Sequence, residues 1–151
     1  MTKITDFCIA QCKIQNDLTV EAIGGMVEAY CFAMEYKHYQ PEEFGEHTIL
    51  EIAEMIKPQN VIGYRQTPVV FANGTTGLSW NLIPRQMYIL TANMYESHLS
   101  PEQFYQEFET IHPFEDGNGR IGAILYNFLK NDRMVEPINP PEYKRFSPRI
   151  L

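Results

Sequence analysis

The chain has little of what marks a secreted, membrane-spanning or nucleic-acid-binding protein. Its 151 residues include three cysteines and one tryptophan, and 12 basic residues face 19 acidic ones, for a net charge of −7. Three cysteines are an odd number and form no disulfide framework. The acidic balance argues against nucleic acid as the main partner. Because no apolar run nears the roughly 20 residues of a membrane span and no basic-plus-apolar leader is present, we expect a cytoplasmic protein that binds no membrane.

Apolar side chains at helical spacing dominate what is there and predict a mainly α-helical fold. A paired glycine, Gly24-Gly25, interrupts one such stripe, and either a bend or a close helix approach would explain it. The sequence Ser100-Pro101-Glu102-Gln103 is a strong helix opening, with a cap and a proline at the first position. The expected helices, one of them capped by Asn16 or Asp17, cover residues 7–12, 17–36, 48–57, 84–96, 101–111 and 121–131.

A different pattern runs from Val61 to about Leu82. It has β-branched residues at Val61, Ile62, Val69 and Val70, and Asn73-Gly74 and Gly77 are turn signals, so the pattern predicts a β-hairpin. The open edge of a two-stranded hairpin can accept an extended peptide through main-chain hydrogen bonds. By its residues alone, the hairpin is as consistent with a purely structural role as with binding a target.

The residues from His112 to Arg120 carry the chemistry of the chain. Gly117-Asn118-Gly119 allows a tight turn that opens directly into a helix, and oriented amides at a helix N-terminus bind anions. Arg120 is favourable there if the anion is a phosphate, whose geometry the guanidinium matches. Asp116 is a hard oxygen ligand that suits Mg²⁺ held jointly with nucleotide phosphates. His112 is suited to accept a proton from a hydroxyl near neutral pH.

An ordinary turn is the alternative interpretation of Asp116-Gly117-Asn118-Gly119. A lone Gly-Asn-Gly would favour that alternative, as short motifs often occur without a ligand. A plain turn, however, needs no histidine, phenylalanine, carboxylate and arginine at fixed offsets. Their joint occurrence therefore favours a functional loop.

At these positions the chain resembles the Fic (filamentation induced by cAMP) family, whose signature is His-x-Phe-x-Asp/Glu-Gly-Asn-Gly-Arg-x-x-Arg. Gly63-Tyr64-Arg65 and Val69-Val70-Phe71 resemble the family's substrate flap. The resemblance implies a Fic-like helical bundle with a small β-hairpin flap beside the active-site loop, most like small, single-domain bacterial or phage members. It implies one domain over residues 1–151, with a core at about 17–131 and a tail at about 132–151.

The resemblance also implies transfer of AMP from ATP to a Ser, Thr or Tyr hydroxyl of a target protein, with Mg²⁺ as cofactor. His112 resembles the general base, Asp116 the metal ligand and Phe114 the apolar anchor of the loop. The flap residues that would contact the target are Val69, Val70 and Phe71. The nucleotide-binding residues implied are Glu115, Gly117, Asn118, Gly119 and Arg120.

Ala123 departs from the signature, since it stands where the family has its final arginine. In the family that arginine clamps the nucleotide phosphates and pairs with an inhibitory glutamate. A charged hydrogen bond is worth about 1.5–3 kcal/mol, so its absence predicts weakened rather than abolished catalysis. A natural variant with altered nucleotide use, a degenerate enzyme and a deliberate change remain open.

The family's inhibitory Ser/Thr-x-x-x-Glu-Gly/Asn pattern is missing from the sequence. Either a separate antitoxin-like inhibitor protein supplies it, or such control is absent. Two rivals to protein adenylylation also follow from Ala123. One is transfer of another phosphate-containing group, such as UMP, phosphocholine or phosphate. The other is a binding module that keeps the fold and flap but has lost turnover.

Overall fold

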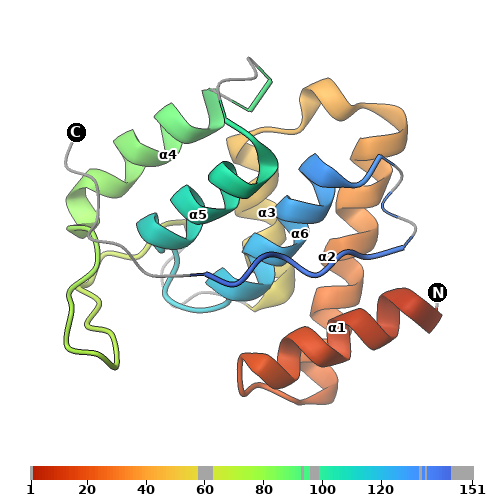
Figure 1. Ribbon diagram of the computed structural model, residues 1–151, viewed down its shortest axis with the longest axis horizontal. Coiled ribbons are helices and arrows are strands. Elements are labelled where there is room, and N and C mark those ends of the chain that lie inside the picture. The colour runs from red at the N-terminus through yellow and green to blue at the C-terminus, as the bar shows by residue number, and fades with distance from the viewer. Residues whose placement is uncertain are drawn as a thin grey trace.

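Six α-helices make up most of the computed structural model, which describes residues 2–57, 63–92, 94–95, 99–132, 134 and 136–143. The mainly helical fold predicted from the sequence is confirmed (Figure 1). Two short 3₁₀ helices lie between them: η1 between α2 and α3, and η2 directly before α4. The bounds are α1 Thr2–Ile14, α2 Val20–Tyr39, η1 Pro41–Glu43, α3 Glu46–Ile56, η2 Trp80–Leu82, α4 Ile83–Ala92, α5 Pro101–Ile111 and α6 Asn118–Lys130.

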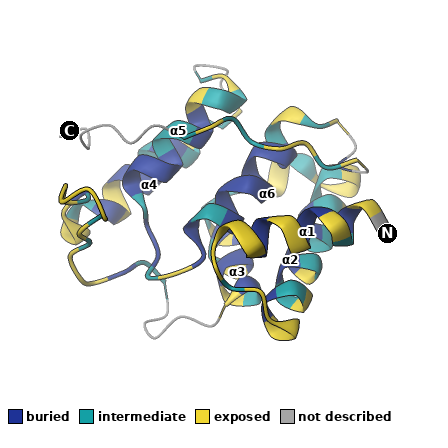
Figure 2. Ribbon diagram, turned by 60° about the horizontal axis from the view of Figure 1, so that its bottom comes forward, coloured by how far each residue is buried: buried dark blue, intermediate teal, exposed yellow. Residues whose placement is uncertain are grey.

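Helix α6 lies at the centre of the bundle and contacts α1, α2, α3 and α5. All of residues 121–128 are buried, and Figure 2 shows this helix as an almost continuous buried element among half-exposed neighbours. A helix that is apolar on nearly every side belongs inside a domain. Packing from four directions fixes the position of its N-terminus, where the signature loop ends.

Helix α1 is longer than the short helix predicted at residues 7–12, and it contributes to the core ahead of residue 17. Helix α2 starts after Thr19, whose hydroxyl accepts the N–H of Ala22. The prediction of Asn16 or Asp17 as its cap is therefore wrong. All three residue types cap helices well, so local sequence could not choose among them. The buried residues of α1 include Ile4, Phe7, Cys8 and Cys12.

The paired glycine in α2 marks a close helix approach. A Cβ atom at Gly25 would lie 2.4 Å from the carbonyl oxygen of Met55 in α3, whereas one at Gly24 would meet nothing within 4 Å. Only the second glycine is therefore required. Its missing side chain lets α2 and α3 pack backbone to backbone. Of the two explanations that the sequence allowed, a bend or a close helix approach, the structure supports the close approach.

The segment from 63 to 79, called the flap here, turns back on itself but contains no β-strand. It shows one isolated antiparallel bridge, between Val70 and Thr76. The N–H of Phe71 donates to the carbonyl of Thr75 and that of Gly77 to Val69, both at 2.8 Å. The predicted β-hairpin from 61 to 82 is thus wrong as a strand pair. Residues 61–62 lie outside the described residues, and residues 80–82 are helical.

Buried Arg65 explains why the turn does not extend into a ladder. Its guanidinium donates to the carbonyls of Thr67 and Leu78, which flank the turn, at 2.8 and 2.7 Å. Pro68 in addition has no N–H to donate. The two arms of the flap are therefore joined by this side chain at their base and by a few backbone hydrogen bonds near the turn.

The helix opening predicted at Ser100 is confirmed, and it forms a capping box with Gln103. The hydroxyl of Ser100 accepts the N–H of Gln103, and the side chain of Gln103 accepts the N–H of Ser100. The tail up to residue 143 packs irregularly along the surface: buried Asn127 donates to the carbonyl of Ile138 and accepts its N–H. Among the described residues, no helix has the length and apolar character needed to span a bilayer.

Candidate active site

A six-residue connection joins α5 to α6 and carries the first half of the signature, whose second half lies in α6. It begins at His112, which ends α5 in a left-handed conformation with φ 51°, and it ends at Gly117, with φ 84°. Glycine adopts that conformation without strain, whereas a histidine there needs support from its surroundings. The two left-handed residues let the chain reverse between two helices in a short span.

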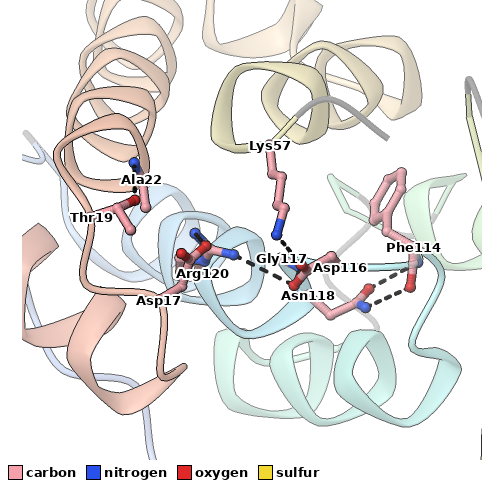
Figure 3. Close-up of polar contacts among 9 residues, drawn as sticks. All are labelled: Asp17, Thr19, Ala22, Lys57, Phe114, Asp116, Gly117, Asn118 and Arg120. Atoms are coloured by element: carbon pink, nitrogen blue, oxygen red, sulfur yellow. Dashed lines mark hydrogen bonds and ion pairs between the residues drawn. The ribbon is translucent and has the colours of Figure 1, made fainter. Parts of the chain in front are cut away.

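The side chain of Asn118 closes this loop. Its Oδ1 accepts the N–H of Phe114 at 2.9 Å, and its Nδ2 donates to the carbonyl of Phe114 at 2.8 Å (Figure 3). The Phe114 ring, expected to anchor the loop, is fully buried and packs 5.5 Å from the ring of Tyr64. Both polar atoms of the Asn118 amide thus take part in holding the loop closed.

The sequence predicts an anion cradle at the N-terminus of α6. Gly117 precedes the helix without a side-chain cap, and the first amides of a helix have no acceptor within it. The N–H of Gly117 is bonded to Asp116 Oδ1 at 2.7 Å. The amides of Asn118, Gly119 and Arg120 belong to the first turn and, with the helix dipole, favour an anion in front of them.

Arg120 lies in this first turn with its side chain almost completely buried. Its Nη1 is 3.1 Å from Asp17 Oδ2, and its Nη2 is 3.6 Å from Asp116 Oδ1. Asp17 comes from the connection between α1 and α2, which therefore borders the site (Figure 3). A buried guanidinium needs a charged partner, and Asp17 supplies one that sequence reasoning had treated only as a helix cap.

Gln15 from the end of α1 lies directly over Gly119. A Cβ atom at Gly119 would be only 2.2 Å from Gln15 Nε2. Gln15 is itself exposed, so this end of the side chain can move aside. The absence of a side chain at Gly119 thus makes room for the Gln15 amide, and only Gln15 has to move for a ligand to approach this turn.

Asp116 is half exposed, with 52% of its side chain accessible, and its Oδ2 lies 2.8 Å from Lys57 Nζ. Burial raises the pKa of this carboxyl, but the Lys57 ammonium, the Gly117 N–H and Arg120 outweigh it and lower the pKa below the ordinary value. The hydrogen bond to Asp116 and its charge raise the pKa of Lys57. Asp116 is therefore ionised at neutral pH and half exposed just before α6, next to partly exposed Glu115.

His112 is partly exposed at the start of the loop and lies under the flap. The ring of Phe71 meets the imidazole edge to face, with centroids 5.3 Å apart. Arg65 Nε donates to the carbonyl of His112 at 2.7 Å, and the N–H of Arg65 to that of Pro113 at 2.8 Å. Arg65 and Phe71 thus hold the backbone and the ring of His112 against the flap.

The other two predicted flap residues face outward to different degrees. Val70 is 69% exposed, and Val69 is intermediate. Phe71 is the member of the trio that touches the site. The structure therefore brings His112, Asp116, Gly117, Gly119 and Arg120 to one end of α6, and leaves Val70 on the open side of the flap.

Sequence reasoning had assigned no site role to Lys57, Asp17 or Gln15. Each comes from a helix end distant in the chain, and no spacing pattern links it to the signature. Arg65 was noticed only as part of the flap resemblance. Arg65 is only 1% exposed and donates to four backbone carbonyls. Hydrogen bonds to backbone carbonyls leave no pattern in the sequence.

Fold and loop together define a helical protein in which a short connection starting at a histidine leads into the N-terminus of a buried helix. Residues 84–129 match the model of the Fic/DOC family. This stretch contains α5, the whole signature loop and nearly all of α6. The Fic resemblance predicted from the loop is confirmed by this match and by the folds of solved Fic-domain proteins.

Two solved structures illustrate the likeness. A Fic domain containing signaling protein from Bacteroides thetaiotaomicron is 25% identical, with a TM-score of 0.62 over 74% of this chain and 48% of that one. A Fic family protein from Desulfovibrio desulfuricans is 19% identical, with a TM-score of 0.60 over 85% of this chain and 48% of that one. This chain spans about half the length of both. Comparison with curated protein sequences finds no match.

Proposed function

We propose that the protein transfers AMP from ATP to a Ser, Thr or Tyr hydroxyl of a target protein. Fic-family proteins typically transfer phosphate-containing groups, and the fold and the match of residues 84–129 link this chain to them. The observation that carries the finer proposal is the loop itself. It sets an imidazole at one end and an anion-binding helix N-terminus with a buried arginine at the other.

The phosphates of the donor would lie across the first turn of α6. Backbone amides of this turn and the guanidinium of Arg120 are the donors in reach. Gly119 adds no side chain in front of them, and the exposed side chain of Gln15 would move aside. Phosphoryl-type transfer depends mainly on positioning and charge stabilisation. Because α6 is buried along most of its length, its first turn is held rigidly and can position the phosphates.

Asp116 fits a Mg²⁺ ion as a single protein ligand. Its carboxylate is ionised and half exposed, and no cluster of three or more His, Cys, Asp or Glu is found in the part of the chain that the structure describes. Phosphate oxygens and water would complete the coordination, as is usual for this ion. When bound, Mg²⁺ neutralises charge on the phosphates.

His112 would act as the general base. The target hydroxyl oxygen bonds to the α-phosphorus, pyrophosphate leaves, and the hydroxyl proton passes to the imidazole. Arg65 and Phe71 restrict the imidazole to the space between loop and flap. The exposed outer side of the flap, with Val70, would receive an extended segment of the target.

The test is intact-mass analysis of candidate targets incubated with ATP and Mg²⁺, supported by ATP labelled at the α or the γ position. We expect an added AMP, label transfer from the α position only, and a loss of at least about 100-fold in His112→Ala. Transfer of the γ label would show phosphate transfer instead. Transfer that is unchanged in His112→Ala would exclude His112 as the base, and target binding without any label would show a binding module.

A further inference from the structure

Lys57 is a second cation at the phosphate end of the site. It ends α3 as its C-cap, and its Nζ lies 2.8 Å from Asp116 Oδ2, while Arg120 lies 3.6 Å from the other oxygen of the same carboxylate (Figure 3). Two positive groups from different helices thus flank one ionised carboxylate. Only one of the two belongs to the signature.

The packing of α3 sets Lys57 in this place. Ile56, the residue before it, is buried, and a Cβ atom at Gly117 would be 3.2 Å from Ile56 Cγ2. The end of α3 is therefore held directly against the turn that opens α6. The Lys57 side chain is 48% exposed, so its four-carbon stem can move while its backbone stays beside the cradle.

The charges at this end of α6 suit a polyanion only if Lys57 takes part. Two carboxylates, Asp17 and Asp116, face the two cations, and Arg120 is buried against Asp17. Ala123, where the signature has a second arginine, is fully buried and carries no charge. Lys57 is thus the cation in the described part of this cluster with both exposure and a flexible stem.

We propose that Lys57 is a phosphate-binding residue that supplies the positive charge which the signature's final arginine would provide. When the donor enters, Nζ turns from Asp116 to a phosphate oxygen beyond the α-phosphate. This inference rests on the proposed function, because it assumes that the cradle binds a polyphosphate. Lys57 would then favour donors with a di- or triphosphate over AMP.

The test uses inorganic pyrophosphate as the probe, with calorimetry in the absence of divalent metal. All variants are made in an Asp116→Asn background. Without Lys57, the unneutralised Asp116 carboxylate would itself repel phosphate, and this would weaken binding even if Lys57 made no contact with the phosphate. In that background we expect Lys57→Met to weaken pyrophosphate binding roughly 10-fold or more and Lys57→Arg to retain most of it. The double-mutant comparison isolates the contact from neutralisation of Asp116.

Lys130 provides the matched control. It is an equally exposed lysine, 46% accessible, at the other end of α6, with Nζ 3.1 Å from Glu102 Oε2. Lys130→Met should leave pyrophosphate binding unchanged. Equal losses in the two lysine variants would overturn the proposal, since they would report only net charge.

The outcomes separate this inference from the proposed function. If the Asp116→Asn protein binds pyrophosphate equally well with and without the additional Lys57→Met change, Lys57 only neutralises Asp116, and the inference fails while AMP transfer stands. If the wild-type protein transfers no group and binds neither ATP nor pyrophosphate, the proposed function and the inference fail together.

Discussion

At the scale of single residues, the site depends on one position where a side chain is missing. Gly119 faces the movable end of Gln15, so a methyl group there would displace Gln15 rather than strain the backbone. The same methyl group would protrude into the space that a phosphate needs in front of the first turn of α6. Folding and binding therefore place different demands on this residue.

Gly119→Ala should consequently separate stability from ligand binding. We expect its unfolding free energy to stay within about 1 kcal/mol of the wild type, because alanine is a better helix former than glycine. ATP affinity measured by calorimetry should fall at least about 10-fold, since the phosphate loses its close approach to the amides. Unchanged ATP affinity would contradict a cradle at this turn.

Arg65 is the residue on which the position of His112 depends most. Its buried guanidinium donates to the carbonyl of Ile111 at the end of α5, to that of His112 in the loop, and to two carbonyls of the flap. Burial lowers its pKa, because the charged guanidinium is removed from water. One side chain thus fixes both walls of the space around the imidazole.

We expect Arg65→Met to lower the unfolding free energy by about 3 kcal/mol or more, because several buried carbonyls lose a charged donor. Arg65→Lys keeps the charge and part of the hydrogen bonding, so its loss should be smaller. Urea denaturation of both variants is the measurement. A methionine variant as stable as the wild type would refute the bonding network around the guanidinium.

At the scale of helices, the bundle is set by contacts that bring backbones together. Helix α2 approaches α3 at Gly25, and α3 in turn places Ile56 and Lys57 beside Gly117. Gly25 therefore helps to set the position of α3, and with it the distance between the C-terminus of α3 and the N-terminus of α6, although Gly25 lies outside the site.

The two adjacent glycines of α2 offer a matched test. Gly25→Ala places a methyl group 2.4 Å from the Met55 carbonyl oxygen and should lower the unfolding free energy by about 1–3 kcal/mol, as overpacking does. Gly24→Ala meets nothing and should raise it by up to about 1 kcal/mol. Equal denaturation midpoints for the two variants would argue against the close approach.

At the scale of the whole molecule, most of the helical bundle could be predicted from the sequence. The periodic apolar stripes and the Ser100 capping box indicated the helices because these signals are local. The flap could not be predicted correctly, since Arg65 takes the carbonyls that a strand ladder would use. The signature identified the loop, but partners such as Asp17 and Lys57 arise from tertiary packing and have no local pattern.

The stability of the whole fold should depend on pH through Glu102. The Tyr126 hydroxyl and then the Lys130 ammonium hold the pKa of this α5 carboxyl below its ordinary value. A lowered carboxyl pKa contributes stability above the unfolded pKa near 4.5, and that contribution is lost as the pH falls through the folded value.

Glu102→Gln should therefore be less stable than the wild type at about pH 7, by at most about 1 kcal/mol, because the lysine pair is half exposed. The difference should disappear at low pH, below both pKa values. Denaturation midpoints at the two pH values, with the exposed Glu51→Gln as control, give the comparison. A constant difference at both pH values would contradict an ionised Glu102 in the fold.

The most direct measurement of the proposed donor site is an amide NMR titration of the wild-type protein with ATP and Mg²⁺. If the donor's phosphates lie across the first turn of α6, the largest shifts will occur at the amides of Asn118, Gly119 and Arg120. No shifts, or shifts centred on amides away from the signature loop, would contradict a polyphosphate site at this helix N-terminus.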